Sequence, residues 1–198
     1  MIKNQKSQKG YTLVELLAVI AVVIVVGVII SGILVSSLRG GSKSNVLDNV
    51  RQNGNNAIAQ MSKMILYAQY FNGVSTNGQF FTTNCTQAPV VSPSPTPAPV
   101  NFKYLKITSF DGHQTIFSCS NTDSITGDVT ISSGSASLID NSTVVLDTCS
   151  FSCLQNNIGQ PAIIGINFTL SQKTSSTFSE KKATIPFYTS ITIRNNNL

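Results

Sequence analysis

The chain has 198 residues, of which 11% are charged and 41% are hydrophobic, and its formal net charge at pH 7 is +5. Lys3, Lys6 and Lys9 precede the first acidic residue, so the remaining chain has little net charge and gives weak electrostatic support for nucleic-acid binding. One His, no Trp and eight Asp and Glu residues leave few groups for acid–base, metal or nucleophilic catalysis. We therefore expect a protein that is not an enzyme and holds no cofactor.

An uncharged apolar run of twenty residues extends over positions 16–35. As an α-helix it is about 30 Å long, which matches the hydrocarbon core of a bilayer. The lysines before this run outnumber Arg39 and Lys43 after it, which predicts a cytoplasmic N-terminus and an exported C-terminal region. A cleaved secretory signal is the alternative, but the run is longer than a usual h-region and no A-x-A-like site follows it. We therefore predict a retained membrane span.

Glu15 is the only acidic or basic side chain in residues 11–35. A carboxylate in a membrane costs several kcal/mol unless it finds a partner or water, which makes this residue a candidate functional position. The alternative is a carboxylate that simply reaches the headgroups from the start of the helix.

The residues from Lys9 to Leu16 read Lys-Gly-Tyr-Thr-Leu-Val-Glu-Leu. With the basic leader before it and the uncharged span after it, this string resembles the type IV prepilin motif, with Tyr in place of the usual Phe. The resemblance covers about residues 1–35 and implies that a prepilin peptidase cuts between Gly10 and Tyr11 and methylates the new amino group of Tyr11. It also implies that the Glu15 carboxylate of an incoming subunit pairs with the terminal amine of its neighbour, which removes the cost of both buried charges.

This resemblance implies a minor pilin or pseudopilin, a structural subunit of a type IV pilus, a type II secretion filament or a DNA-uptake filament. The implied partners are other pilin subunits through the N-terminal helix, the prepilin peptidase, the inner-membrane assembly platform and membrane lipid. The protein is then expected in the inner or cytoplasmic membrane, with its C-terminal domain outside, and afterwards in an extracellular filament. Many pilins have a Pro midway through this helix, where this chain has Gly32, a residue that either weakens the helix or leaves a notch for a neighbouring helix.

Two alternative functions stay open. The first is a pilin-like tip subunit that binds a surface or DNA, for which Lys103 with Lys106 and Lys181 with Lys182 supply the basic pairs. The second is a signal-anchored exported protein that does not assemble.

Beyond the span, apolar residues continue at spacings of three and four over residues 46–68, which predicts an amphipathic helix covered by a globular domain. Gly40, Gly41 and Ser42 separate this helix from the span and are expected to bend or loosen it. We expect one long helix over residues 11–71 that ends near Asn72 and Gly73.

Five of the seven prolines lie in residues 87–100, which predicts an extended, semi-rigid spacer. Residues 104–109 and 114–120 flank Asp111-Gly112 and predict a β-hairpin. Further strands are expected over residues 128–132, 142–153, 162–171 and 182–194. In the last of these, apolar residues alternate with a slip after Phe187, which favours an antiparallel sheet with one exposed face.

These elements predict an α+β fold in which a long N-terminal helix packs on a C-terminal antiparallel β-sheet. The expected organisation is a leader peptide (1–10), a transmembrane and assembly helix (11–38), an amphipathic helix (39–72), a loop with the Pro-rich spacer (73–102) and a β-sheet domain (103–198).

The four cysteines, in an exported domain, predict two disulfides with three possible pairings. If residues 142–153 form one strand, Cys149 and Cys153 are about 13 Å apart, too far to bond to each other, and would pair separately with Cys119 and Cys85. A turn between them would reverse this inference. A zinc site is disfavoured because the only His, His113, is expected to be exposed beside the Asp-Gly turn.

Overall fold

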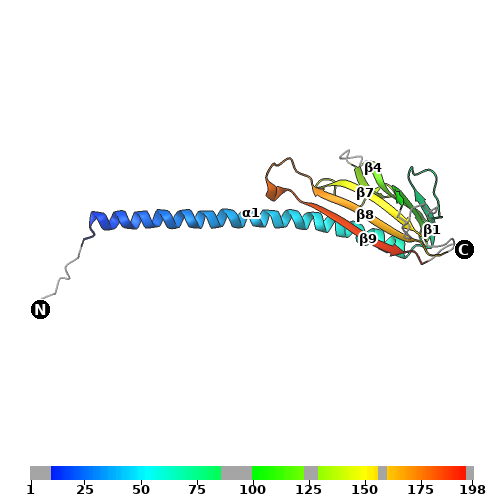
Figure 1. The fold of residues 1–198 in the computed structure, drawn as a ribbon, viewed down its shortest axis with the longest axis horizontal. Helices are drawn as coiled ribbons and strands as arrows, with labels where there is room; N and C mark the ends of the chain where they lie inside the picture. The colour runs from blue at the N-terminus through cyan, green and yellow to red at the C-terminus, as the bar shows by residue number, and fades with distance from the viewer. Residues whose placement is uncertain (1–9, 86–99, 123–128, 156–159, 195–198) are drawn as a thin grey trace, which may run out of the picture. The chain divides into compact units, whose positions relative to one another are not determined.

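The computed structural model describes residues 10–85, 100–122, 129–155 and 160–194. The chain forms two compact units, residues 1–42 and residues 43–198. One α-helix, α1 (Leu13–Leu66), begins in the first unit and ends in the second, and the strands of two antiparallel sheets follow it (Figure 1). The predicted α+β class, with a long N-terminal helix followed by antiparallel β-structure, is confirmed. Residues 1–9 of the leader and most of the Pro-rich spacer lie outside the described residues.

The second unit contains two sheets where the sequence predicted one. The five-stranded sheet has the order β1-β3-β4-β5-β6, and its strands are β1 (Tyr70–Ser75), β3 (Tyr104–Thr108), β4 (Gln114–Thr122), β5 (Val129–Ser133) and β6 (Ala136–Ser137). The four-stranded sheet has the order β2-β7-β8-β9, and its strands are β2 (Val100–Phe102), β7 (Val144–Leu154), β8 (Ile163–Gln172) and β9 (Thr184–Thr192). A short 3-10 helix, η1 (Ser179–Lys181), lies in the connection between β8 and β9.

The helix ends at Leu66, several residues before the predicted end near Asn72. The backbone amide of Gln69 already donates to the carbonyl of Thr108, and β1 then pairs with β3 over its whole length. Gly73 lies at the irregular step of this pairing with φ of 118°, in the region that favours glycine. The Asn-Gly pair therefore marks a bulge in a strand and not a helix terminus, because sheet pairing outcompetes helix extension there.

The predicted hairpin is confirmed as β3 and β4, with Gly112 in the turn at φ of 82°. The four other predicted strands correspond to β5, β7, β8 and β9, whereas β1, β2 and β6 were not predicted. The predicted slip in the last strand is wrong. The odd-numbered side chains from Ala183 to Ile193 all lie on the more buried side, so the alternation is unbroken. It looked interrupted in the sequence because one inward position, Thr189, is polar.

The core of the second unit is built from α1 and from residues of both sheets. The helix buries Val50, Gly54, Ala57, Met61 and Ile65, which follow one another at spacings of three and four. The inward residues of β8 are completely buried: Ile164, Ile166, Phe168 and Leu170. The residues between them, apart from the buried Gly165, are exposed or partly exposed. The opposite face of this sheet exposes Tyr188, as expected for a sheet with one exposed face.

Two disulfides connect the β-structure, Cys85–Cys153 and Cys119–Cys149. The expectation that Cys149 and Cys153 bond separately to the other two cysteines is confirmed, because both lie on the inward side of the single strand β7. Cys119 belongs to β4, so its bond to β7 joins the two sheets.

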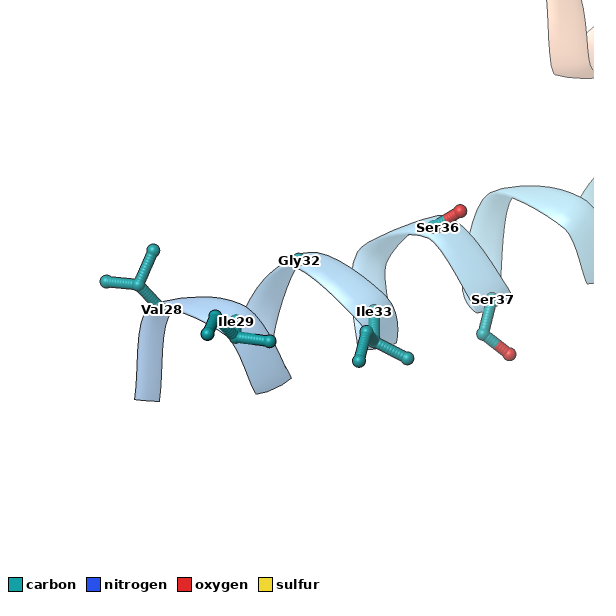
Figure 2. Close-up of a pocket in the computed structure, with 6 residues that line it drawn as sticks. All are labelled: Val28, Ile29, Gly32, Ile33, Ser36 and Ser37. Carbon is teal, nitrogen blue, oxygen red and sulfur yellow. The ribbon is translucent and has the colours of Figure 1, made fainter. Parts of the chain in front are cut away.

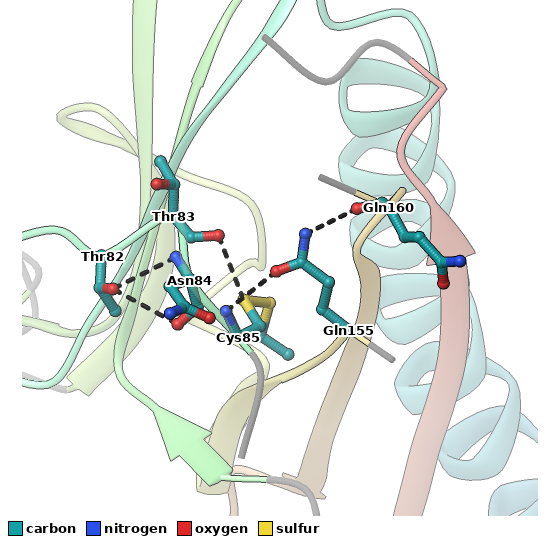
Figure 3. The surroundings of a disulfide bond; sticks show 7 residues. Thr82, Thr83, Asn84, Cys85, Gln155 and Gln160 are labelled. Atoms are coloured by element: carbon teal, nitrogen blue, oxygen red, sulfur yellow. Dashed lines mark hydrogen bonds between the residues drawn. A yellow bond between two sulfur atoms is a disulfide. The ribbon is translucent and has the colours of Figure 1, made fainter. Parts of the chain in front are cut away.

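The segment after β1, which contains Cys85, is held by hydrogen bonds as well as by the disulfide of Cys85 (Figure 3). The buried Gln155 side chain accepts from the backbone amide of Cys85 at 3.2 Å and donates to the carbonyl of Gln160 at 2.6 Å. Gln155 thereby fixes the segment after β1 to the end of β7.

Candidate functional site

The start of α1 holds Thr12 and Glu15 in a helix-capping arrangement. The backbone amide of Glu15 donates to the Thr12 hydroxyl at 3.3 Å, and the backbone amide of Leu16 donates to the Thr12 carbonyl at 3.2 Å. Thr12 is therefore the N-cap, and Glu15 occupies the third helical position. This role of Thr12 was missed in the sequence, although the Thr-x-x-Glu spacing was there to indicate it.

Glu15 lies in the first turn of α1 and is exposed. The helix macrodipole stabilises a negative charge at this end, so the position suits a carboxylate even without a partner. In a membrane this stabilisation is small compared with the several kcal/mol that an unpaired intramembrane charge costs. The local structure therefore explains where the carboxylate sits, and in a membrane its charge would still require a partner or water.

Gly10 and Tyr11 lie just before the helix, and both are exposed. A Cβ placed on Gly10 would have no atom within 4 Å, and Gly10 is not among the glycines with positive φ. Packing and backbone geometry therefore give no reason for glycine at this position. By contrast, Gly54, Gly73 and Gly165 each leave no room for a Cβ, so their presence is explained by the fold.

The first unit presents large apolar side chains to its surroundings all around the helix. Its most apolar 18-residue window has a mean hydropathy of 3.2, and none of that window is buried. Leu16, Ile24 and Ile33 are each more than half exposed. A helix this long, apolar and uncovered is a candidate membrane span, and its length and composition alone would also fit a signal sequence.

A shallow apolar notch lies on this helix around Gly32 (Figure 2). Gly32, which has no side chain, and Ser36, which has a small one, are one turn apart on the same face, with Val28 one turn before them. A Cβ on Gly32 would have no atom within 4 Å, so the chain's own packing does not call for glycine there. Helix interfaces in membranes are enriched in such small residues because they let two backbones approach closely.

The two basic pairs considered for DNA binding are not brought together into one cluster. Lys103 donates to the carbonyl of Cys149 at 2.7 Å, and the Lys106 ammonium lies 5.5 Å from the centre of the Phe81 ring. Lys181 and Lys182 belong instead to the connection between β8 and β9 of the other sheet. His113 is exposed in the β3–β4 turn, and within the described ranges no three His, Cys, Asp or Glu side chains are grouped like metal ligands.

No family model, curated protein or solved structure matches the chain. The features of the chain that bear on its function are therefore the start of α1 and the apolar half of that helix.

Proposed function

We propose that the chain is a pilin-like structural subunit, a minor pilin or pseudopilin, that is anchored in a membrane by α1 and assembles into a filament through it. The observation that carries the proposal is the placement of Glu15 as the lone carboxylate in the first turn of a long, uncovered apolar helix. A charge at that place is costly in lipid and becomes favourable when a cation of a neighbouring subunit meets it.

In this proposal a prepilin peptidase cuts between Gly10 and Tyr11 and methylates the new terminus. Cleavage removes the basic leader and leaves an α-amine two residues before α1, which starts at Leu13. The absence of any packing reason for glycine at position 10 supports a role in processing, because a residue without Cβ lets a protease approach the backbone closely.

The apolar surface and the Gly32 notch supply the contact with neighbouring helices. The hydroxyl of Ser31 donates to the carbonyl of Gly27 at 2.8 Å, so this polar group is satisfied within the helix and does not oppose burial. In the assembled filament, helices of other subunits replace the lipid around α1.

The test replaces Glu15 with Gln, which keeps the size of the side chain and removes its charge. We expect Glu15→Gln to be processed and retained in the membrane but to be strongly depleted from sheared filaments, in a strain that lacks the wild-type copy. Incorporation equal to that of the wild type would contradict the pairing mechanism.

The matched control is Thr12→Val, which removes the N-cap hydroxyl and leaves the charge of Glu15 in place. Loss of an N-cap costs about 1 kcal/mol of helix stability. If charge pairing is the function of Glu15, Thr12→Val assembles much better than Glu15→Gln. Equal depletion of both variants would instead assign Glu15 a role in helix initiation. The N-terminus of each variant is determined first, because both positions lie close to the cleavage site.

A further inference from the structure

The connection between β8 and β9, residues 173–183, combines an exposed aromatic side chain with several cations. Phe178 is 62% exposed, directly before η1. Lys173, Lys181 and Lys182 are also exposed, and Glu180 is the only acidic residue in the segment. The segment therefore presents a net positive charge around an apolar ring.

A lysine of α1 fixes this connection in place. The half-buried Lys43 donates to the carbonyl of Ser179 at 3.0 Å and to the carbonyl of Lys182, at the two ends of the η1 turn. Figure 1 shows the connection, in orange, next to α1. The position of Phe178 is thereby tied to the first residue of the second unit.

This attachment point is close along the chain to the end of the apolar helix. Lys43 follows Leu38, an exposed apolar residue, by five residues. Five residues span about 7.5 Å in a helix and at most about 18 Å in an extended chain, which limits how far Lys43 can lie from Leu38. The headgroup region of one leaflet is about 5–7 Å thick, and with Leu38 at the edge of the hydrocarbon core the chain is short enough to bring η1 to that region.

We propose that the β8–β9 connection is a membrane-surface contact, in which Phe178 inserts between anionic phospholipid headgroups and Lys181 and Lys182 bind their phosphates. Aromatic residues favour the membrane–water interface, and lysines near an anionic surface add an electrostatic attraction. The proposal rests on the membrane-anchoring part of the proposed function and not on assembly. It gives the second unit a preferred side toward the bilayer before any filament forms.

The experiment places one fluorescent label at a time on the full chain in lipid vesicles. Because the four native cysteines are paired in disulfides, an added cysteine is the only thiol available for labelling. Phe178→Cys tests the contact, and Phe110→Cys is the matched control, because Phe110 is similarly exposed at 68% but precedes Asp111 in the β3–β4 turn. Val25→Cys reports the apolar helix.

Quenching is measured with nitroxides attached either to lipid headgroups or to acyl chains. Vesicles of phosphatidylcholine are compared with vesicles that also contain phosphatidylglycerol. We expect the headgroup nitroxide to quench the label at 178 much more than the label at 110, and the phosphatidylglycerol to increase this difference. Replacing Lys181 or Lys182 with Ser should reduce the ratio of membrane-bound to free states of the 178 label by about fivefold for each lysine removed.

Equal quenching at 178 and 110, with the label at 25 quenched by the acyl-chain nitroxide, would overturn this proposal and leave the membrane span intact. An unquenched label at 25 would overturn membrane anchoring itself, and this proposal with it. A label at 178 that responds equally to both vesicle types would overturn the binding of anionic headgroups. If the label at 178 shows no contact with lipid and Phe178→Ser nevertheless lowers the filament yield, the segment serves contacts between subunits instead.

Discussion

The ring of Phe187 in β9 lies directly on Gly54 of α1. A Cβ built on Gly54 would be 2.1 Å from the tip of that ring, far closer than any real contact. Phe187 also stacks on Phe168 of β8, with the ring centres 5.2 Å apart. The absence of a side chain at position 54 therefore sets how closely α1 approaches the four-stranded sheet.

This contact predicts that Gly54→Ala destabilises the second unit although alanine favours helices. Overpacking costs about 1–3 kcal/mol, which exceeds or offsets the roughly 1 kcal/mol gained from helix propensity. We expect a net loss of up to about 2 kcal/mol of unfolding free energy in denaturant titrations. The smaller side chain of Phe187→Leu should recover much of that loss in the double variant.

Gly41→Ala is the control for helix propensity, because a Cβ there would have no atom within 4 Å. It should not destabilise the second unit, and any change it causes should be a gain of at most about 1 kcal/mol. A stabilising effect of Gly54→Ala equal to the propensity gain would show that Phe187 does not pack on position 54.

The disulfides predict a definite pattern of linked peptides. Digestion of protein from its native compartment without reductant should give Cys85 linked to Cys153 and Cys119 linked to Cys149, with no free thiol. Removing either bond should lower the unfolding free energy by about 4 kcal/mol, because the closed loops of 68 and 30 residues are long. Four alkylatable cysteines, or a bond between Cys149 and Cys153, would contradict this arrangement.

Asp140 predicts a small loss of stability in acid. The hydroxyl and backbone amide of Ser142, followed by the Thr143 hydroxyl, lower the pKa of the Asp140 carboxyl despite a slight opposing effect of desolvation. A carboxyl with a lowered pKa in the folded state stabilises the protein above its ordinary pKa, and this contribution disappears as the pH falls through the folded-state value.

Asp140→Asn should therefore lower the stability at neutral pH and show a smaller further loss than the wild type between about pH 6 and about pH 2. Urea titrations at several pH values measure this difference. The effect is small because the carboxylate is exposed. Identical pH profiles of the two proteins would contradict the assigned hydrogen bonds.

Local patterns made much of the fold predictable. The long helix, the Asp-Gly hairpin and four further strands follow from periodicity and turn residues within short windows. The separation of Cys149 and Cys153 on β7 was predictable for the same reason, since strand geometry fixes their distance.

The errors arose where partners distant in the sequence decide the structure. The apolar spacing of α1 continues toward Phe71, but pairing with β3 takes the backbone from Gln69 onward into a sheet. The division into two sheets depends on which strands pair across the chain, for example β2 with β7. A short segment such as β2 contains no signal for that choice.

The candidate site shows the same contrast. Gly10, Tyr11 and Glu15 were predicted as site residues because their motif is contiguous, and the N-cap role of Thr12 could have been predicted from the Thr-x-x-Glu spacing. The hydrogen bonds from Lys43 to Ser179 and Lys182 join residues 136 and 139 positions apart, and no local pattern reveals them.

The most direct test of the proposed function is the N-terminus of the mature protein in membranes. Intact-mass and N-terminal peptide analysis should find a chain that begins at N-methylated Tyr11. Gly10→Ala should be processed slowly and Gly10→Leu should stay uncut, although neither change should affect folding, since a Cβ at position 10 would have no atom within 4 Å. A mature chain that begins at Met1, or one that begins beyond residue 35, would contradict the pilin-like function.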